Sequence, residues 1–269
     1  MERVREAMER ALEKKWVPSV RPAVLTPAAH RRNERTEIPA QTASRENFPY
    51  VPVAQNVFAR NRLVAAIKGN PHREAYSVLQ TSVVGQMTEN KWVSLGVTGP
   101  ATGAGKTLTA INLSIALATQ ASRKVLLLDL DLNCPSVHTH FDYEPKFGLE
   151  DCLFEGTAFR NASFEPSIDG LAVLPVRGIN SNAMQILRSD SLRNLLDTIK
   201  KDDPDRLIIA DLPAIESAEH ARAYSALVDS TLLIVEDTTT READLKKALA
   251  MIGRSQLLGT VLNRTEAVS

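Results

Sequence analysis

The chain has 269 residues, 43% of them hydrophobic, and its 32 basic and 32 acidic side chains cancel. This length suits one α/β domain with an appendage, and the apolar fraction excludes a chain that is disordered throughout. The zero net charge excludes an overall electrostatic attraction to nucleic acid or to a membrane. The only two cysteines, Cys134 and Cys152, form no disulfide framework and fit a reducing compartment.

Charge is distributed unevenly along the chain. Residues 1–70 contain 13 basic and 7 acidic side chains, a net charge of +6, which leaves 19 basic and 25 acidic side chains, a net charge of −6, in residues 71–269. A basic arm of this kind contacts an anionic membrane surface or an acidic partner, or is simply solvated. No stretch approaches ~18 consecutive apolar residues and no signal region follows Met1. We therefore expect a cytoplasmic protein, with the inner face of the membrane as the site of any membrane contact.

The first 70 residues are expected to form an arm. Residues 1–16 place apolar side chains at helical spacing and predict a short amphipathic helix, which either docks on a partner or on the body, or frays in solvent. Residues 17–70 are predicted to be a flexible linker, because prolines interrupt any long element: Pro18, Pro22, Pro27, Pro39, Pro49 and Pro52. The folded domain is then expected to span residues 71–269.

Helical and strand patterns alternate after residue 70. In chain order we expect a helix at 72–88, a strand at 92–98, a helix at 106–120, strands at 125–130 and 171–175, a helix at 191–200, a strand at 207–210, a helix at 217–227 and a strand at 231–235. A capping box of Thr239 and Glu242 begins a helix that continues to about Gly253, and a strand follows at 258–262. Strands that are apolar on both faces favour a buried, mostly parallel sheet. The pattern predicts a three-layer, doubly wound α/β fold with its ligand site at the carboxyl ends of the strands.

One loop shows a clear chemical signature. Residues 99–107 read Gly-Pro-Ala-Thr-Gly-Ala-Gly-Lys-Thr between a strand and a helix, which is the context of a phosphate-binding P-loop. The glycines let backbone N–H groups point at phosphate oxygens, Lys106 supplies charge for the β and γ phosphates, and Thr107 offers a hydroxyl ligand to Mg²⁺. Pro100 stands where the usual motif has glycine, so the motif is a deviant Walker A. We expect Mg-ATP to contact Thr102, Gly103, Ala104, Gly105, Lys106, Thr107 and Leu108.

Two further strands end in carboxylates. Asp129 and Asp131 follow the apolar run from residue 125, and they lie on the same side if the strand continues that far. Carboxylates gathered at a strand end repel one another unless a cation lies between them, and Mg²⁺ is the obvious candidate. Asp211 ends the strand predicted at 207–210 and fits a Walker B aspartate. The alternative is that these are ordinary surface aspartates that begin loops.

Two other kinds of site are less favoured. The spacing of Cys134, His138, His140 and the distant Cys152 matches no common zinc site, so these are interpreted as loop and packing residues. Ser, His and Asp all occur, but no nucleophile-elbow motif does, so a hydrolase triad is unsupported.

Several short sequences occur in the order found in one family. Residues from about 71 to 263 resemble the domain of the bacterial tyrosine kinases (BY-kinases) of capsule and exopolysaccharide loci. A short charged helix followed by a Pro-rich linker is similar to the arm of the exosortase-associated subgroup. The sequences that carry the resemblance are Glu74-Ala75-Tyr76, Thr102–Thr107 with Asn112-Leu113, Asp129-Leu130-Asp131-Leu132 with Pro135, His138 and Phe141, Gly148-Leu149-Glu150-Asp151, Leu174-Pro175, Asp211-Leu212-Pro213 and Gly259-Thr260-Val261-Leu262-Asn263.

The resemblance implies phosphoryl transfer from ATP to tyrosine hydroxyls in the control of exopolysaccharide synthesis or export. Asp129, Asp131 and Asp211 would share Mg²⁺ coordination and activation of the incoming hydroxyl, with none of them singled out as the base. Lys106 would bind phosphate, and Asn263 would lie near the adenine. The resemblance also implies a membrane-anchored regulator of polysaccharide chain length as partner, allows a homo-oligomer, and implies no nucleic acid.

The sequence departs from the family pattern at several places, including Asn133, Leu212 and Ala214, and two of the departures concern assembly and autophosphorylation. The helix expected at 72–88 carries Ser77 and Gln80 where the family usually has arginines after Glu74, which argues against the usual ring oligomer. The last tyrosine is Tyr224, so we expect no autophosphorylation in a tail after Asn263. The other candidate acceptors are Tyr50, Tyr76 and Tyr143.

Three functions remain open. The first is a protein-tyrosine kinase, and the second is a regulatory ATPase without kinase activity in the same machinery. The third is a partitioning or positioning ATPase of the related deviant-Walker type. That type carries a signature lysine five residues before the P-loop lysine, where this chain has Ala101.

Overall fold

The computed structural model describes residues 48–178, 182–237, 239–253 and 256–264. The described residues contain one six-stranded sheet in the order β3-β2-β4-β1-β5-β6, in which every pair is parallel. This confirms the predicted parallel α/β sheet. The amphipathic helix expected at 1–16 and the linker up to residue 47 lie outside the described residues. The strands are β1 Ser94–Thr98, β2 Val125–Asp129, β3 Leu171–Leu174, β4 Leu207–Asp211, β5 Ser230–Glu236 and β6 Leu257–Asn263.

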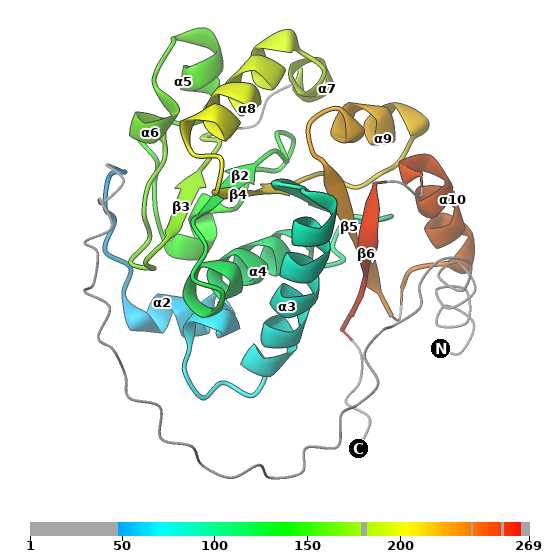
Figure 1. The fold of residues 1–269 in the computed structure, drawn as a ribbon, viewed down its shortest axis with the longest axis horizontal. Helices are drawn as coiled ribbons and strands as arrows, with labels where there is room; N and C mark the ends of the chain where they lie inside the picture. The colour runs from blue at the N-terminus through cyan, green and yellow to red at the C-terminus, as the bar shows by residue number, and fades with distance from the viewer. Residues whose placement is uncertain (1–47, 179–181, 238, 254–255, 265–269) are drawn as a thin grey trace.

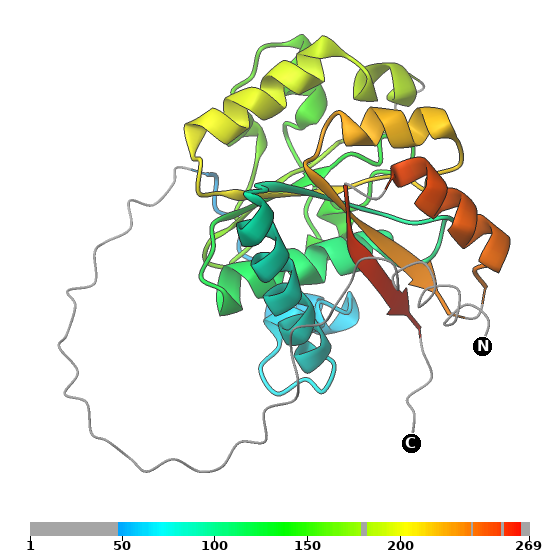
Figure 2. The ribbon, with the colours of Figure 1, turned by 45° about the vertical axis from the view of Figure 1, so that its right-hand side comes forward.

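Helices cover both faces of the sheet, as Figures 1 and 2 show. The layer on one face contains α2 Gln55–Arg60, the 3₁₀ helix η1 Val64–Ala66, α3 Arg73–Asn90 and α4 Lys106–Gln120. The layer on the other face contains α5 Leu149–Phe154, α7 Ala183–Leu187, α8 Asp190–Asp202, α9 Ala218–Ser225 and α10 Glu242–Ile252. The 3₁₀ helix η2 His138–Phe141 and the short helix α6 Phe159–Ala162 lie within the connections.

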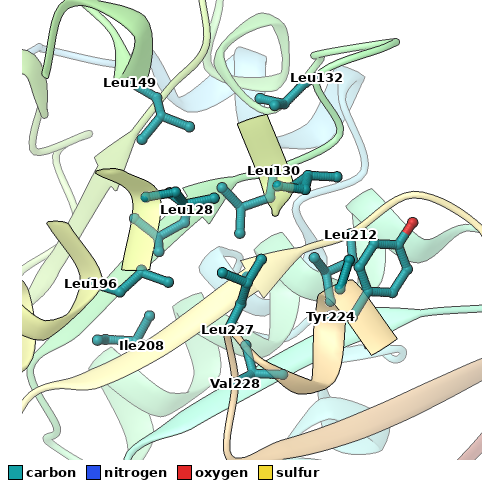
Figure 3. Packing of buried hydrophobic residues seen from close by; sticks show 14 of the residues in the cluster. Leu128, Leu130, Leu132, Leu149, Leu196, Ile208, Leu212, Tyr224, Leu227 and Val228 are labelled. Atoms are coloured by element: carbon teal, nitrogen blue, oxygen red, sulfur yellow. The ribbon is translucent and has the colours of Figure 1, made fainter. Parts of the chain in front are cut away.

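The strands divide the interior into two cores. Successive side chains of a strand point to opposite faces; in β2, Leu126 and Leu128 therefore pack with the helices α5, α7, α8 and α9, and Leu127 packs against α4. Figure 3 shows part of the first core, in which Leu128 and Ile208 lie among side chains from the covering helices. Burial on both faces explains why the strands are apolar runs rather than alternating ones.

Residues 48–70 correct the expectation of a flexible linker from 17 to 70. The 3₁₀ helix η1 packs against α4, helix α2 packs against η1 and η2, and the side chains of Phe58, Leu63 and Ala65 are almost fully buried. The side-chain amide of Asn112 on α4 joins this segment to the domain: its Oδ1 accepts from the N–H of Ala65 at 2.9 Å. The prolines of the segment lie before α2 rather than inside it, so they do not prevent the chain from folding onto the body.

The start of α10 also differs from its expected form. Its N-cap is Arg241, without a side-chain capping bond, so the predicted box of Thr239 and Glu242 does not form. The Thr239 hydroxyl instead donates to Glu236 at the end of β5, at 2.6 Å. The short elements α5, α6, α7 and η2 were not predicted, because helices of four to six residues are too short to show a helical period.

Asp229 connects β5 to β1 at the amino end of the sheet. Its Oδ2 accepts from the backbone N–H groups of Val93 and Ser94, both at 2.9 Å, and its Oδ1 lies 3.2 Å from Nζ of Lys200. Burial acts to raise the pKa of this carboxyl, but the hydrogen bonds and Lys200 outweigh it and hold the pKa below its ordinary value.

Asp229→Ala is expected to lower the free energy of unfolding by about 2 kcal/mol at pH 7, because two backbone donors lose a charged acceptor. Since the pKa is lower in the folded state, this stability is present above the unfolded pKa of ~3.9 and is lost as the pH falls through the folded pKa. Urea unfolding at pH 7 and pH 3 measures the effect. The exposed Asp197 provides the control as Asp197→Ala. An equal loss for Asp229→Ala at both pH values would contradict the assignment.

Candidate active site

The loop between β1 and α4 has the backbone of a phosphate cradle. Gly103 and Gly105 have φ of +79° and +86°, which side-chain-bearing residues rarely adopt. Gly99 lies so close to the carbonyl oxygen of Ile234 that a Cβ there would be 2.5 Å from it. Helix α4 begins at Lys106, so its first N–H groups and its dipole face the loop. The loop therefore has the conformation that the sequence predicted.

Lys106 and Asn263 lie against this loop. The side chain of Lys106 is buried, and its Nζ is 3.3 Å from the carbonyl oxygen of Ala101. Asn263 ends β6, and its side-chain amide donates to the carbonyl oxygen of Ala104 at 2.8 Å. The contact of Asn263 with the loop was not predicted from the sequence. Asn263 reaches the loop because β6 pairs with β5 and β5 pairs with β1, and this strand order leaves no local pattern in the sequence. Its predicted place near adenine stays a prediction.

Asp129 and Asp211 lie side by side at the carboxyl ends of β2 and β4. They are register partners in the parallel pair, and both are fully buried. Asp129 accepts from the backbone N–H groups of Asp131, Ser136 and Val137 at 3.0–3.2 Å. Among the described residues, neither carboxylate oxygen of Asp211 has a hydrogen-bond partner.

The two carboxyls ionise with difficulty where they lie. Burial raises the pKa of Asp129 to about 7 against the opposing effect of its backbone hydrogen bonds. Burial also raises the pKa of Asp211 well above its ordinary value, and the charge of Asp129 raises it further. The neighbouring Thr107 hydroxyl and Lys106 lower it. A cation beside Asp211 would relieve this cost, so the residues present fit a Mg²⁺ ion shared with Thr107.

Asp131 lies differently from the expectation for it. Strand β2 ends at Asp129, so Asp131 is not on the strand and the predicted common side does not arise from strand alternation. Asp131 lies in a turn, half-buried, and accepts from the N–H of Cys134 at 3.2 Å. The described residues contain no group of three His, Cys, Asp or Glu side chains that could hold a metal ion. Mg²⁺ binds through few protein ligands and keeps water or phosphate oxygens, so a role for Asp131 in the site stays a prediction.

The remaining predicted residues follow the loop. Ala101, Thr102 and Gly103 are exposed, Ala104 is buried, and Thr107 and Leu108 are half-buried. The amides of Ser136 and Val137, which hold Asp129, were not predicted; a backbone donor has no signature in a sequence. The exposed Cys134 and half-buried Cys152 carry free thiols.

The sequence of this domain matches a known protein family. A family model described as the CobQ/CobB/MinD/ParA nucleotide binding domain matches residues 95–269, from β1 onward. The chain belongs to this family. The deviant P-loop, its lysine and the acids at the ends of β2 and β4 all lie within the matched segment.

Individual proteins of known name are also similar to this chain. The tyrosine-protein kinase YwqD of Bacillus subtilis (strain 168) is 29% identical over 208 residues, which cover 76% of this chain and 86% of that protein. The succinoglycan biosynthesis transport protein ExoP of Rhizobium meliloti (strain 1021) is 27% identical over 168 residues, which cover 60% of this chain but only 21% of that longer protein. The crystal structure of the chimerical protein CapA2B2 superposes with a TM-score of 0.68 at 25% identity, covering 81% of this chain and 93% of that one.

Other relatives are also named tyrosine-protein kinases, so the predicted resemblance is confirmed. None of the helices in the described part of the chain is both long and apolar enough to cross a membrane.

Gly105→Ala is expected to weaken nucleotide binding at least about ten-fold. The φ of +86° costs an alanine about 1–2 kcal/mol, and its Cβ would lie 2.3 Å from Nδ2 of Asn263, which must then leave the carbonyl of Ala104. Nucleotide titration monitored by calorimetry measures the change. Gly85→Ala in α3 is the matched control, because a Cβ there meets nothing within 4 Å and binding should not change. Unaltered affinity in Gly105→Ala would refute this account of the loop.

Proposed function

We propose that the protein is an ATP-dependent protein-tyrosine kinase that regulates exopolysaccharide synthesis or export. The observation that carries the proposal is a P-loop facing two buried carboxylates, one of which has no hydrogen-bond partner among the described residues. The names of the relatives support tyrosine as the acceptor and capsule or exopolysaccharide production as the setting.

In this mechanism the protein positions charge rather than forming a covalent bond with substrate. The loop from Thr102 to Leu108 would hold the phosphates of ATP through backbone N–H groups, with Lys106 neutralising the β and γ phosphates. Thr107, Asp129 and Asp211 would hold Mg²⁺, which supplies charge neutralisation to the transferring phosphoryl group. Asp131, half-buried in the turn after β2, would help to orient the incoming tyrosine hydroxyl.

The partner that we propose is a membrane-anchored regulator of polysaccharide chain length. The relative ExoP supports this proposal, because it is named as a transport protein of succinoglycan biosynthesis and most of its length lies outside the part that matches this chain. The protein would then work at the inner face of the membrane. On α3, Ser77 hydrogen-bonds to Gln120 of α4 at 2.6 Å rather than offering a charge to a second copy, which supports an assembly unlike the usual ring.

One observation favours a regulatory ATPase without kinase activity as the second candidate. Only one of the four tyrosines is well exposed, so the described chain offers few acceptors of its own. Ala101, in place of a signature lysine, gives the partitioning-ATPase reading no support.

Phosphoryl transfer by the purified full-length chain separates the two candidates. The chain is incubated with Mg-ATP and a synthetic Glu-Tyr copolymer, beside Lys106→Met, and phosphotyrosine is quantified by mass spectrometry. Phosphotyrosine in the copolymer that depends on Lys106 establishes the kinase. ATP binding without phosphotyrosine in the copolymer or the protein would replace it with the regulatory ATPase.

A further inference from the structure

The four tyrosines differ sharply in accessibility. The side chain of Tyr50 is 64% exposed, whereas Tyr224 is 1% exposed. Figure 3 shows the ring of Tyr224 beside Leu212 in the core beneath α9. Burial raises the pKa of Tyr224 above its ordinary value. Its hydroxyl cannot reach a kinase site without unfolding of this core.

Tyr76 and Tyr143 are only half-buried, but their rings are engaged. Tyr76 on α3 packs into the core beside α4, and its pKa is raised by burial against a side-chain hydrogen bond with Thr109. The ring of Tyr143 lies 4.3 Å from the ring of Phe164, centroid to centroid. Presentation of either hydroxyl to another protein would break these contacts. Tyr50 is therefore the one tyrosine of the chain that is exposed as it stands.

The segment around Tyr50 is held on the domain in an extended form. Tyr50 forms a parallel bridge with Glu165, and the N–H of Val51 donates to the carbonyl oxygen of Glu165 at 2.9 Å. Ser167 Oγ lies 3.0 Å from the Tyr50 hydroxyl and accepts from the N–H of Val53 at 2.9 Å. Before the bridge, the ring of Phe48 lies against the Phe159 ring at 6.3 Å.

These contacts hold the backbone on both sides of Tyr50, and its ring stays largely exposed although its hydroxyl contacts Ser167. A pre-extended segment with an exposed tyrosine loses little conformational freedom when a second protein binds it, and only the surface contact with Ser167 must break to free the hydroxyl. The exposed ring and ordered backbone together describe an acceptor segment.

We propose that Tyr50 is the tyrosine that the protein phosphorylates on another copy of itself. This inference rests on the proposed kinase function and names its acceptor. In the step, the bond between the γ-phosphorus of ATP and the β,γ-bridging oxygen breaks, and a bond forms between that phosphorus and Oη of Tyr50. ADP leaves with the bridging oxygen, and the phenol proton passes to solvent or to a carboxylate of the site.

The sheet separates Tyr50 from the P-loop of its own chain. Tyr50 pairs with Glu165, and the adjacent Phe164 pairs with Val173 of β3, which lies three strands from β1. Figure 1 shows the segment, in blue, running along the β3 side of the molecule. One strand spacing separates Tyr50 from Glu165, a second separates Phe164 from β3, and three more lead across β2 and β4 to β1. At ~4.8 Å for each spacing, Tyr50 lies roughly 24 Å from β1. A tyrosine side chain covers a fraction of this distance, so the transfer runs between two molecules.

A mixing experiment tests both the acceptor and the intermolecular route. Wild-type chain with Mg-ATP is the enzyme, and full-length Lys106→Met with a distinguishing tag is the substrate. Two further substrates carry Tyr50→Phe or Tyr143→Phe in the same Lys106→Met chain. We expect phosphate on Tyr50 of the tagged chain, a loss of at least about ten-fold with Tyr50→Phe, and no loss with Tyr143→Phe.

The Glu-Tyr copolymer, added in parallel, separates the two ways of failing. If the copolymer is phosphorylated but the tagged chain carries phosphate on Tyr76, Tyr143 or Tyr224 instead of Tyr50, the acceptor is wrong and the kinase function stands. If neither the copolymer nor the tagged chain is phosphorylated, the kinase function fails and the acceptor with it. Phosphate on Tyr50 of the wild type, but never on the tagged chain, would overturn the intermolecular route.

Discussion

Replacing Asp211 with asparagine is expected to stabilise the nucleotide-free protein and to reduce phosphoryl transfer at least about a hundred-fold. Stability rises while the rate falls, because the buried carboxylate destabilises the fold when no cation is bound and serves as a ligand when one is. Asp211 is fully buried beside Asp129, and within the described residues its oxygens lack a hydrogen bond of normal geometry, with Thr107 and Lys106 as the neighbours that favour its charge. Asparagine keeps the shape and removes the negative charge.

The stabilisation should amount to about 1–2 kcal/mol at pH 8, because burying a carboxylate without a hydrogen-bond partner costs more free energy than burying a neutral amide. For a domain of this size that is a rise in Tm of roughly 2–8 °C. Thermal unfolding in EDTA measures it. Adding Mg-ATP should then raise the Tm of the wild type, since a ligand that binds the folded state stabilises it, and raise that of Asp211→Asn much less.

Asp131→Asn is the informative companion variant. Asp131 is half-buried in a turn and has a hydrogen-bond donor in Cys134, so its replacement should leave the EDTA stability nearly unchanged. If it also lowers phosphoryl transfer, Asp131 belongs to the site as the resemblance implies. A lower Tm for Asp211→Asn in EDTA would contradict the view that its carboxylate is electrostatically unfavourable in the nucleotide-free protein.

The sequence was enough to locate the glycine-rich loop and two carboxylates at strand ends, whose functional roles stay predictions. The P-loop could be predicted because its glycines are required by backbone geometry, and positive φ at Gly103 and Gly105 fits that requirement. Asp129 and Asp211 could be predicted because apolar runs of strand length show where parallel strands end. That the two are register partners could not, because strand order depends on crossovers that leave no local pattern.

Two of the errors have the same physical origin. The linker expectation for residues 48–70 counted prolines and polar residues, which describe local preference, whereas the segment is ordered by tertiary contacts. Phe58 and Leu63 enter a core built by α3 and α4, and local propensity carries no information about such a partner. The capping box at Thr239 failed for the same reason, since Glu236 on β5 takes the Thr239 hydroxyl.

Asn112→Ala tests this explanation and is expected to cost about 3 kcal/mol of unfolding free energy. Asn112 is fully buried on α4, and its Oδ1 accepts from the N–H of Ala65. Its Nδ2 donates to the carbonyl oxygens of Arg62 and Leu108 at 3.1 and 3.0 Å. The variant leaves the N–H of Ala65 buried without its partner, at about 1–3 kcal/mol for each such group.

Ser114→Ala is the matched control for this variant. Ser114 is as buried as Asn112 on the same helix, but its hydroxyl donates only to the carbonyl of Ala110 one turn earlier, so its loss should cost little. Urea unfolding gives the energies, and hydrogen exchange of residues 55–66 shows where the loss acts. We expect exchange in α2 and η1 to accelerate in Asn112→Ala while the strands stay protected, because the amide joins that segment to a body that folds around the sheet. Uniform acceleration across the sheet would mean that residues 48–70 are part of the cooperative core rather than a layer attached to it.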